Sequence, residues 1–562
     1  MPRSSQTRAA LSRRVATVAA GFVLAGAGAV AGAVPAAGEA PPLVDVQLLA
    51  LNDFHGNLEP PSGSSGEIED VPAGGVEFLA TQLAMLADEV QKPNTITVAA
   101  GDLIGASPLL SAAFHDEPTI EALGLAGLDL ASVGNHEFDE GSDELLRIQN
   151  GGCHPEDGCA DPARPYEGAG FQYLSANAFV TETGEPLLPP YAIEKVQGMR
   201  IGFIGMTLEG TPDIVTQSGI AGLEFRDEVE TGNRYAAELQ EQGVEAIVVL
   251  LHEGGTQAGG GGINDCTGLT GPVVDIATGF SDAIDVVVSG HTHQAYNCVI
   301  DDKIVTSASS FGRLVTDIDL QIDRATGDVI TAKAANVIVG RDVPADADQT
   351  ELIGRYRTLL GPIASEEVGE TTAAITREAA PSGESALGNL IADAQLAATD
   401  DEQGAVAAFM NPGGVRADLD AGPVTYEEAF TVQPFNNYLT TLDLTGAQLD
   451  CLLEQQFVTE RILQPSASVR YTVNQAGAPG TAADPCTGTK VDAITIGGAP
   501  VDPAATYRIT VNSFLADGGD GFSVLTQGTN EVVGGPDLDA FTAYLTANRP
   551  TAPPATDRIT LG

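Results

Sequence analysis

The sequence predicts an α/β fold in two globular domains that are joined by a helix. Short apolar runs rich in β-branched and aliphatic residues, which are typical of buried strands, alternate with stretches of helical periodicity. The chain has 562 residues, too many for one ordinary hydrophobic core. Its apolar share of 43% is that of a folded protein and not of a disordered one.

The first domain is expected over residues 41–340. Between its first two strands, five apolar residues recur with the spacing of an amphipathic helix: Val76, Leu79, Leu83, Leu86 and Val90. Strands that alternate with helices build layered α/β domains, and the ligand site of such a domain lies beyond the carboxyl ends of the strands. The predicted strands are Val44–Leu51, Thr95–Ala100, Leu128–Val133, Met199–Gly205, Ala246–Leu251 and Asp285–Ser289.

A charged, helix-favouring stretch over residues 341–370 follows, and we interpret it as a connector helix between the domains. Leu352, Tyr356 and Leu359 form its apolar face. A smaller α/β domain is expected over residues 371–562. It contains a predicted helix at Glu384–Ala398 and predicted strands at Ala405–Met410 and Tyr507–Val511.

Residues 1–40 have the composition of an export signal peptide. Arginines crowd the beginning, an uncharged run rich in Ala, Gly and Val extends from Val15 to Val34, and Ala31-Gly32-Ala33 resembles a cleavage site. Ser12-Arg13-Arg14 leaves a twin-arginine signal open, and a retained membrane anchor is the alternative to cleavage. No later apolar run is long enough to span a bilayer. We therefore expect a secreted or cell-wall-associated protein with no stable membrane insertion after signal removal.

The six cysteines agree with export to an oxidising compartment. An even number suits a set of disulfides, although six cysteines allow about 15 connectivities. Short loops favour pairing between neighbours. A zinc site made of cysteines is the rival, but no Cys-x-x-Cys spacing occurs. The expected pairs are Cys153 with Cys159, Cys266 with Cys298, and Cys451 with Cys486.

The charge balance excludes some partners. With 26 basic and 77 acidic residues, the net charge is −51, which repels nucleic-acid polymers and anionic membrane surfaces. A small anionic substrate would then have to be recruited locally, by metal ions or by a few well-placed arginines. Most of the carboxylates are interpreted as a solvated exterior.

Five of the seven histidines lie in short motifs at or just after the ends of predicted strands. The motifs are Asp53-Phe54-His55, Gly101-Asp102, Gly134-Asn135-His136-Glu137-Phe138-Asp139, Leu251-His252-Glu253 and Gly290-His291-Thr292-His293. Because strand ends are where α/β sheets bind ligands, we expect these motifs to meet at one site.

The side chains of the motifs predict a site for two divalent metal ions. Imidazole and carboxylate groups suit zinc, manganese and similar ions, and a carboxylate between two cations can bridge them. The expected ligands are Asp53, His55 and His293 for one ion, Asn135, His252 and His291 for the other, and Asp102 as the bridge. Two such ions lower the pKa of a shared water and clamp phosphoryl oxygens, which indicates a phosphoesterase.

His136 is the predicted catalytic side chain, because it neighbours the expected ligand Asn135. It would stabilise the charged transition state or protonate the leaving oxygen, and Asp139 would fix its tautomer. The hypothesis is an in-line displacement without a covalent phosphoenzyme. Glu137 and Glu253 are interpreted as structural.

Each of these residues also has an ordinary interpretation. An Asp or Asn at a strand end is more often a helix cap or a turn former, and a histidine after an apolar strand can be a core residue. The joint occurrence of the motifs, always at a strand end, favours the metal site. His115 and His154 lie outside the motifs and receive no predicted role.

The motifs resemble those of the secreted 5′-nucleotidase family, a branch of the calcineurin-like metallophosphoesterases. The resemblance rests first on Asn52-Asp53-Phe54-His55-Gly56, Gly101-Asp102, Gly134-Asn135-His136-Glu137-Phe138-Asp139 and Gly290-His291-Thr292-His293. It implies that the first domain is a four-layer β-sandwich flanked by helices and that the second binds the nucleotide.

Three segments of the second domain extend the resemblance, and they are Asn411-Pro412-Gly413-Gly414-Val415-Arg416, Pro434-Phe435-Asn436-Asn437 and Asn512–Phe522. It implies that Phe435 and Phe514 sandwich a nucleobase, that Asp520 contacts the nucleoside, and that Asn411 and Arg416 hold the phosphate or ribose. Stacking of this kind tolerates different bases. The ordinary alternative for both phenylalanines is core packing.

The chain departs from the family pattern at one helix. Well-known members carry further arginines shortly before or inside the helix that here reads Leu387–Ile391, whereas this chain has Ser385 and Asn389. Arg377 is the nearest basic residue and is the expected substitute. The family also implies that the nucleotide-binding domain swings towards the metals, with residues 341–370 as the hinge.

The expected function is hydrolysis of nucleoside 5′-monophosphates to nucleoside and phosphate. Two alternatives use the same site: hydrolysis of the pyrophosphate of nucleotide sugars such as UDP-sugars, and cleavage of 2′,3′-cyclic nucleotides. A thiosulfonate hydrolase of the superfamily is less favoured, because nothing in the sequence suggests a protein-borne sulfur substrate. The non-enzymatic alternative is a nucleotide-binding surface protein with a relic site.

Overall fold

The computed structural model of the chain describes residues 42–61, 66–90, 94–215, 217–258, 261–435, 437–481 and 484–562. The expected export signal at residues 1–40 lies outside the described residues. None of the helices in the described part of the chain has the length and apolar character needed to cross a membrane.

Two six-stranded sheets form the centre of the first half of the chain. One consists of β17 (Val329–Ile338), β16 (Leu314–Asp323), β1 (Leu43–Leu51), β4 (Thr95–Ala100), β5 (Leu130–Ser132) and β6 (Gln172–Leu174), in this order. The other consists of β14 (Ala295–Ile300), β15 (Lys303–Ala308), β13 (Val286–Ser289), β12 (Ala246–His252), β10 (Met199–Thr207) and β9 (Tyr191–Val196).

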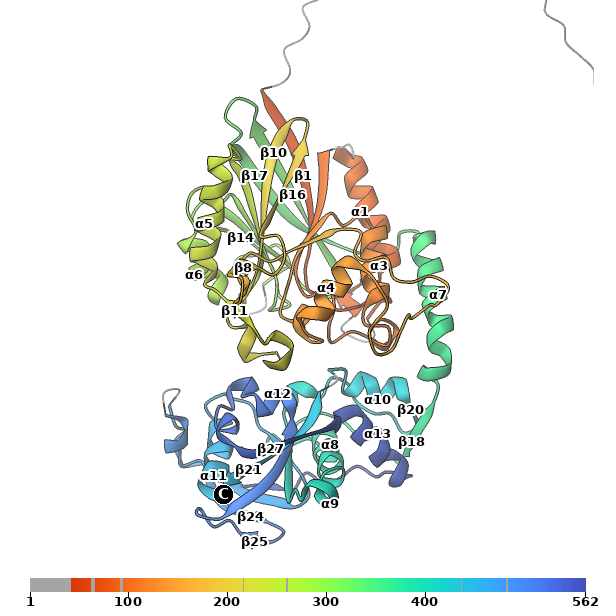
Figure 1. Cartoon of the computed structure of the whole chain (residues 1–562), viewed down its shortest axis with the longest axis vertical. Coiled ribbons are helices and arrows are strands. Elements are labelled where there is room, and N and C mark those ends of the chain that lie inside the picture. The colour runs from red at the N-terminus through yellow and green to blue at the C-terminus, as the bar shows by residue number, and fades with distance from the viewer. Residues whose placement is uncertain are drawn as a thin grey trace, which may run out of the picture. The chain divides into compact units, whose positions relative to one another are not determined.

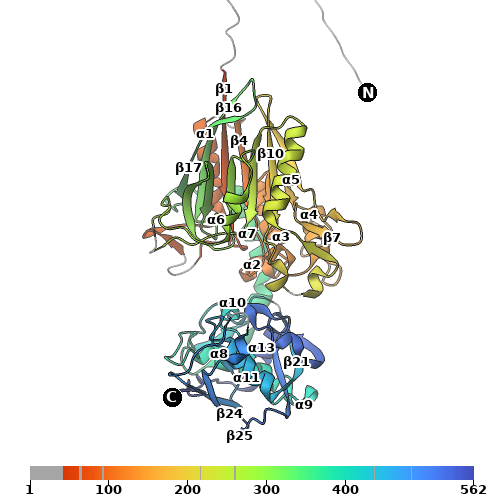
Figure 2. The same ribbon diagram turned by 90° about the vertical axis from the view of Figure 1, so that its left-hand side faces the viewer.

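The two sheets pack face to face, with helices on their outer faces. Val46 and Val98 of the first sheet share a buried core with Phe203 and Val248 of the second. Helices α1 (Val76–Val90) and α3 (Glu117–Leu125) lie along one side of the strands, and α5 (Glu228–Glu241) and α6 (Pro272–Gly279) lie along the other (Figures 1 and 2). The expected four-layer sandwich is confirmed.

The strands that precede the motifs run in parallel within their sheets, which places their carboxyl ends together. β1 pairs in parallel with β4 and β4 with β5, while β12 lies in parallel between β10 and β13. All six predicted strands are present. β5 is shorter than predicted, because the N–H of Leu128 instead donates to the carbonyl of Leu123 at the end of α3, over 3.1 Å.

The connector helix α7 spans Ala347–Ala364, less than the predicted range of 341–370. Asp346 caps its first turn, and Leu352, Tyr356 and Leu360 are buried, while Leu359 is only partly buried. The predicted helix is wrong at both ends. Before it, Arg341 donates to the carbonyls of Gly66 and Ala73, and after it Glu367–Thr371 forms strand β18.

The second half of the chain is a smaller α/β unit, as predicted. Its five-stranded sheet contains β22 (Gln464–Pro465), β19 (Ala407–Met410), β26 (Thr506–Asn512), β21 (Tyr438–Thr445) and β27 (Thr529–Pro536). A four-stranded sheet contains β25 (Ala499–Pro500), β24 (Val491–Ile496), β23 (Val469–Val473) and β28 (Ile559–Leu561). The predicted helix is α8 (Ala386–Ala397), and Ser385 caps it by accepting the N–H of Gly388.

Of the larger remaining helices described in this unit, two contact its five-stranded sheet directly, and one packs on a neighbouring helix instead. Leu390 of α8 and Phe541 share a core with Met410 of the sheet, and Leu449 shares another with Ile509. These helices are α10 (Tyr426–Val432), α11 (Gly446–Gln455) and α13 (Asp537–Ala547). Short elements close to the site described below are α2 (Leu109–Ala112), α4 (Ser142–Asn150) and α12 (Ser513–Ala516).

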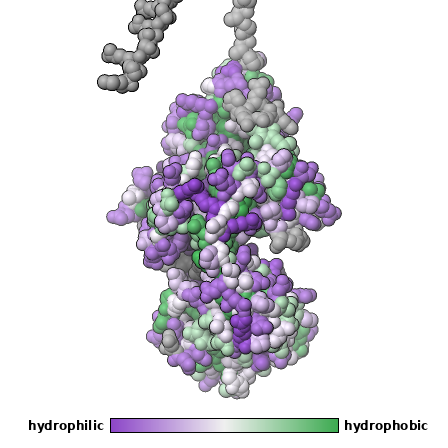
Figure 3. Space-filling view, turned by 90° about the vertical axis from the view of Figure 1, so that its right-hand side faces the viewer, coloured by the Kyte–Doolittle hydropathy of each residue, from purple (hydrophilic) through white to green (hydrophobic). Residues whose placement is uncertain are grey.

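The cysteines pair as neighbours along the chain, as expected. The disulfides join Cys153 to Cys159, Cys266 to Cys298 and Cys451 to Cys486. The surface agrees with the acidic composition. Figure 3 shows a face on which hydrophilic residues dominate and hydrophobic residues are scattered in small groups.

Candidate active site

The seven expected metal ligands lie together at the carboxyl ends of strands from both central sheets. Two come from the loop after β1, one follows β4, one follows β5, one ends β12, and two follow β13. They are Asp53, His55, Asp102, Asn135, His252, His291 and His293, and all but His291 and His293 are buried. Sequence spacing alone thus located a set of side chains that the fold brings together.

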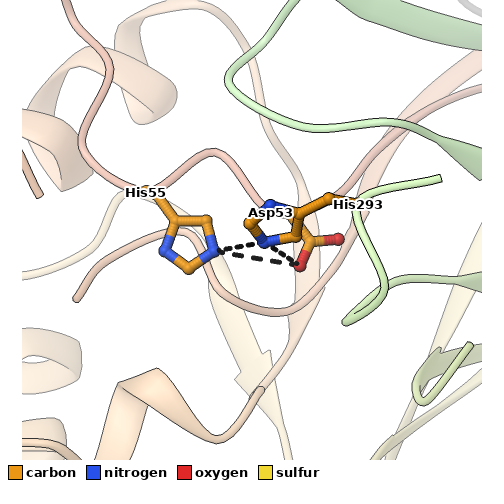
Figure 4. Close-up of side chains that lie close together, drawn as sticks. All are labelled: Asp53, His55 and His293. Atoms are coloured by element: carbon orange, nitrogen blue, oxygen red, sulfur yellow. Dashed lines mark hydrogen bonds and ion pairs between the residues drawn. The ribbon is translucent and has the colours of Figure 1, made fainter. Parts of the chain in front are cut away.

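One group of donor atoms consists of Asp53, His55 and His293 (Figure 4). The Nε2 atoms of His55 and His293 are 3.0 Å apart, and Nε2 of His293 is 3.4 Å from Oδ1 of Asp53. Two imidazole nitrogens at this distance need a proton or a cation between them, because two lone pairs repel each other. The donor set of two imidazoles and one carboxylate suits a divalent transition metal.

A second group surrounds Asn135. Its Oδ1 lies 3.2 Å from Nε2 of His252 and 3.0 Å from Nδ1 of His291. Asp102 lies between the two groups, since its Oδ2 is 2.9 Å from Nε2 of His252 and 3.7 Å from Nε2 of His55. A carboxylate in this position can contact two cations at once.

Backbone carbonyls fix the orientation of two of these imidazoles. Nδ1 of His55 donates to the carbonyl of Gly105 and Nδ1 of His252 to the carbonyl of Ala100, each over 2.8 Å. The proton is thereby held on Nδ1, and the lone pair of Nε2 faces the cluster. This is the tautomer that metal binding through Nε2 requires.

Burial and the neighbouring charges shift the pKa values in the cluster in opposite directions. Burial raises the pKa of Asp53 to about 7, and it lowers the pKa of His291 and of His293 to about 4. Burial also disfavours the charged form of His252, but Asp102 and Asp53 outweigh it and raise the pKa of this imidazole to about 10. A divalent cation would favour the metal-binding form of all four groups, since it repels their protons.

Five of the seven side chains start from left-handed backbone, which L-residues rarely adopt. The φ angles are 50° at Asp53, 47° at His55, 49° at Asp102, 70° at His291 and 54° at His293. Such strain persists only where the surrounding structure imposes it, and it concentrates at functional sites. The geometry of the cluster is therefore built into the fold.

Glycines next to the ligands allow the loops to approach each other closely. A Cβ atom on Gly134 would lie 2.2 Å from Oδ1 of Asp102, and one on Gly290 would lie 2.7 Å from the carbonyl oxygen of Ala100. Either side chain would force the loops apart. The glycines of these two motifs thus serve packing and not turn formation.

His136 and Asp139 are also paired as expected. Nδ1 of His136 lies 2.7 Å from Oδ2 of Asp139, and the backbone N–H of His136 donates to Oδ1 of Asp102 over 3.0 Å. Burial opposes the charge on His136, but Asp139 and Asp102 outweigh it and raise its pKa to about 9. The ring also stacks on Phe435, with 6.2 Å between the centroids.

The residues expected to bind the nucleotide fall into two neighbouring groups. Nδ2 of Asn411 donates to Oδ2 of Asp520 over 3.1 Å. The Arg416 guanidinium lies over the Phe435 ring, 5.6 Å from its centroid. Phe514 is half-buried and packs its ring edge against the backbone at Gly519. Phe435 is half-buried as well, so neither ring is an ordinary core side chain.

Arg377 lies close to Arg416. It donates to the carbonyl of Val415 over 3.4 Å, and its charge, second to burial, lowers the pKa of Arg416. It also lines a cavity of about 310 Å³ together with Ser385 and Gln464. A second guanidinium is therefore available beside Arg416, although the helix α8 carries none.

Comparisons with known proteins agree with this arrangement. The model of the calcineurin-like phosphoesterase family matches residues 46–295, and that of the 5′-nucleotidase C-terminal domain matches residues 365–527. The cell wall protein Lmo0130 of Listeria monocytogenes is 31% identical over 534 residues, which cover 89% of this chain and 67% of that protein. The chain belongs to the 5′-nucleotidase family of calcineurin-like phosphoesterases. This is a family of metal-binding hydrolases that act on phosphoric monoesters.

Other family members extend the comparison. Endonuclease YhcR of Bacillus subtilis is 35% identical over 512 residues, which cover 89% of this chain but only 40% of the longer protein. The 5′-nucleotidase precursor from Thermus thermophilus, known from a crystal structure, is 26% identical in sequence to this chain. The match covers 92% of this chain and 99% of that chain, and the two structures superimpose with a TM-score of 0.70.

The contacts of Glu137 agree with the structural role that was expected for it, but its partners were not predicted from the sequence. Its carboxylate accepts the backbone N–H groups of Asp102, Leu103 and Gly134, and also the Tyr173 hydroxyl. It therefore ties the loop after β4 to the loop after β5, and these loops carry Asp102 and Asn135. Its place in the motif was the only sequence signal, and it did not reveal these partners.

Arg461 was not among the site residues predicted from the sequence. Its Nε lies 3.0 Å from Oδ1 of Asp520, on the side opposite to the contact with Asn411. The side chain is about half exposed, and its segment matches none of the motifs considered above. No signal in the sequence pointed to it.

Proposed function

We propose that this chain is an exported phosphohydrolase that uses two divalent metal ions to cleave nucleoside 5′-monophosphates to nucleoside and phosphate. The main support is the position of Asp102, whose Oδ2 lies between Nε2 of His252 at 2.9 Å and Nε2 of His55 at 3.7 Å. The Thermus relative, which is titled a 5′-nucleotidase precursor and is covered almost completely, supports the substrate class.

Seven side chains would hold the two ions. Asp53, His55 and His293 belong to one ion, Asn135, His252 and His291 to the other, and Asp102 to both. When bound, the ions supply a shared water of lowered pKa and positive charge for the phosphoryl oxygens. Zinc and manganese suit a donor set of four imidazoles, two carboxylates and an amide oxygen.

His136 would complete the reaction from the protein side. Asp139 holds the proton on Nδ1 of this imidazole, so Nε2 is the ring nitrogen that can act on the substrate. Against the effect of burial, Asp139 and Asp102 raise the pKa of this ring to about 9 and so favour its protonated form. It can then stabilise negative charge on the phosphoryl group or protonate the leaving O5′.

Seven side chains would recognise or position the nucleotide. Phe435 and Phe514 would stack on the base. Asp520 would accept from the nucleoside while Asn411 and Arg461 contact its carboxylate, and Asn411 would also hold the phosphate or ribose. Arg416 and Arg377 would bind phosphate oxygens, for which the guanidinium fork is suited. Arg377 would stand in for the arginines that helix α8 lacks. It would therefore affect the affinity for phosphate and the preference among mono-, di- and triphosphates.

The domains would be residues 41–340 for the metals and 371–562 for the nucleotide, with residues 341–370 as the hinge. Within this range, α7 is bound to α3 of the first domain, since Tyr356 donates to Glu121 and Gln349 donates to the carbonyl of Ala122. Bending would then occur just after α7, at residues 365 and 366, because strand β18 begins at Glu367. A cross-link between the two domains should abolish turnover while the metals stay bound, and unchanged turnover would refute the hinge.

Phosphate release from adenosine monophosphate tests the proposal. We expect activity that a chelator removes and that falls by more than about 10³-fold in Asp102→Ala. The matched control is Asp45→Ala, which removes an exposed carboxylate from the same sheet. Full activity in Asp102→Ala would overturn the metal mechanism, and no activity in the wild type towards any nucleotide would favour the nucleotide-binding protein with a relic site.

A substrate panel separates the alternatives. UDP-glucose and 2′,3′-cyclic adenosine monophosphate test the pyrophosphohydrolase and the cyclic phosphodiesterase. A single-stranded oligonucleotide tests polymer cleavage, the activity named for the longer Bacillus relative. We expect the monophosphate to give the highest kcat/KM and the polymer to be a poor substrate, because of the net charge of −51.

Export needs its own test. The proposed signal at residues 1–40 should be absent from the protein recovered outside the cell, and the N-terminal sequence of that protein would give the cleavage site. Recovery with the cell wall fraction would distinguish wall association from full secretion. Retention of the uncleaved chain in the membrane would favour the anchor instead.

A further inference from the structure

His115 and His154, which have no place in the proposed active site, lie together on the surface. Their rings stack with 3.8 Å between the centroids and 12° between the planes. His115 lies in the turn between α2 and α3, and His154 lies in the loop that the Cys153–Cys159 disulfide closes. Asp157 belongs to the same loop, so the disulfide presents His154 and Asp157 as a fixed pair.

We propose that His115, His154 and Asp157 form a third metal site, suited to zinc or an ion of similar ligand preference. Donor atoms of the three side chains all lie within 4.8 Å of one another. Oδ2 of Asp157 is 3.1 Å from Nε2 of His115 and 3.4 Å from Nδ1 of His154. Ligands about 2.0–2.1 Å from a tetrahedral zinc ion are about 3.3 Å apart, so these two distances match zinc coordination.

The protonation of the imidazoles favours this assignment. Nδ1 of His115 lies 2.7 Å from Oε2 of Glu140 and donates to it, which leaves Nε2 for the ion. A carboxylate that accepts from the second nitrogen of a ligating histidine is the usual support of zinc sites. Nδ1 of His154 accepts the N–H of Asp157 over 3.1 Å, so it carries a lone pair. Metal binding would break this hydrogen bond, and the amide N–H would donate to water instead.

The site is reachable from solvent, and metal binding requires a rearrangement of His154. The exposed side-chain fractions are 21% for His115, 16% for His154 and 73% for Asp157. Coordination in the plane of each ring requires His154 to tilt out of its parallel stack. A water molecule would serve as the fourth ligand, as in open zinc sites. Glu140 directly follows Asp139, so the ion would also brace the turn that holds His136.

Zinc would have to displace a proton. Partial burial opposes the charge on His115, but Glu140 outweighs it, with Glu144 and Asp157, and raises its pKa to about 9. Zinc binding should therefore weaken as the pH falls, because a proton and the ion compete for the same nitrogen of His115. A surface cluster that merely collects cations on carboxylates would not show this dependence.

Zinc stoichiometry of the full chain tests the proposal. The chelator-treated protein is dialysed against micromolar zinc with millimolar magnesium, and bound zinc is counted by mass spectrometry. We expect one zinc ion more per chain in the wild type than in Asp157→Asn or His154→Gln. Glu156→Gln is the matched control, because it removes the same charge from the neighbouring exposed residue, and it should bind as the wild type does.

Equal stoichiometry in the wild type and in both ligand variants would overturn the proposal. If the near-ultraviolet circular dichroism shows that a ligand variant does not fold, Glu140→Gln is tested in its place. This variant leaves all three ligands present. It should weaken zinc binding roughly 10–100-fold, as loss of a supporting carboxylate does. Unchanged zinc affinity in Glu140→Gln would count against the site as well.

Discussion

His136 and Asp139 are joined by a contact of 2.7 Å between Nδ1 and Oδ2, one turn of 3-10 helix apart. Asp139→Asn keeps a hydrogen-bonding group there but removes the charge. We expect kcat for adenosine monophosphate to fall by roughly 10²-fold or more, because the imidazole loses its supporting carboxylate. Bound metal should not change. The control is Asp143→Asn, which neutralises an exposed carboxylate in the first turn of α4 and should keep full activity. Wild-type activity in Asp139→Asn would show that the pair has no role in catalysis.

Glu137 should govern metal affinity without touching the metals. In Glu137→Gln, an amide NH₂ replaces one oxygen that accepts backbone N–H groups from the loops of Asp102 and Asn135. Two donors then face each other, and the loops should separate. We expect metal affinity, measured by calorimetry, to fall roughly 10–100-fold. Glu253→Gln, whose carboxylate accepts only the N–H of Gly254 among its described contacts, should have little effect.

Gly134→Ala should disrupt the metal cluster through packing alone. The added Cβ would lie 2.2 Å from Oδ1 of Asp102, which cannot move without leaving the other ligands. We expect loss of metal binding and of activity. Gly354→Ala is the control, since nothing lies within 4 Å of its Cβ in α7, and it should stabilise the helix by up to about 1 kcal/mol. Normal metal content in Gly134→Ala would show that the loops are less constrained than the distances indicate.

Phe514→Ala should raise KM for every nucleoside monophosphate to a similar degree. Loss of one stacking face costs about 1–3 kcal/mol per base, and stacking discriminates little between bases. Hydrolysis of a phosphate ester without a base, such as p-nitrophenyl phosphate, should be unaffected. The exposed Tyr438→Ala, close to Phe435 in the sequence, is the control. An equal loss on both types of substrate would mean that Phe514 serves packing.

The ion pairs of His115 should make folding stability depend on pH. Glu140, Glu144 and Asp157 raise its pKa from the ordinary 6.5 to about 9 in the folded chain, against the effect of partial burial, while His154 stacks on its ring. A raised pKa stabilises the fold below pH 6.5, and this contribution is lost as the pH rises through about 9. With chelator present, denaturant unfolding should show His115→Gln less stable than the wild type by about 1 kcal/mol at pH 6 and equally stable at pH 10.

The sequence predicted the parts of the fold that are marked by continuous apolar runs. All six central strands that carry or flank the motifs lie on such runs, since they are buried on both faces. β16 and β17 were not predicted. In β16, buried residues alternate with partly or fully exposed ones only after its first two residues, and this weaker period is easily lost in a mixed sequence. β17 is partly or fully exposed at all but one residue, and its buried residue, Asn336, is polar.

The start of α7 has a local signal, the cap at Asp346, which the prediction of a helix from residue 341 overlooked. Long-range contacts decide the structure on either side of the helix, because Glu367–Thr371 pairs with residues 422–425. Arg341 is held by carbonyls of Gly66 and Ala73, far away in the sequence. The candidate site was predictable for a different reason. Each of its motifs is local, and parallel pairing brings the strand ends together, whereas the contact between Arg461 and Asp520 depends on the packing of two loops.

The left-handed backbone at Asp53, His55, Asp102, His291 and His293 has a kinetic consequence. The chain bears the conformational free-energy cost of this geometry when it folds. Little rearrangement of the ligands is then needed when an ion binds. The metal-free protein should therefore bind metal ions in a single fast step, at a rate set by the loss of hydration water from the ion. A protein built this way can be completed by whichever suitable cation it meets.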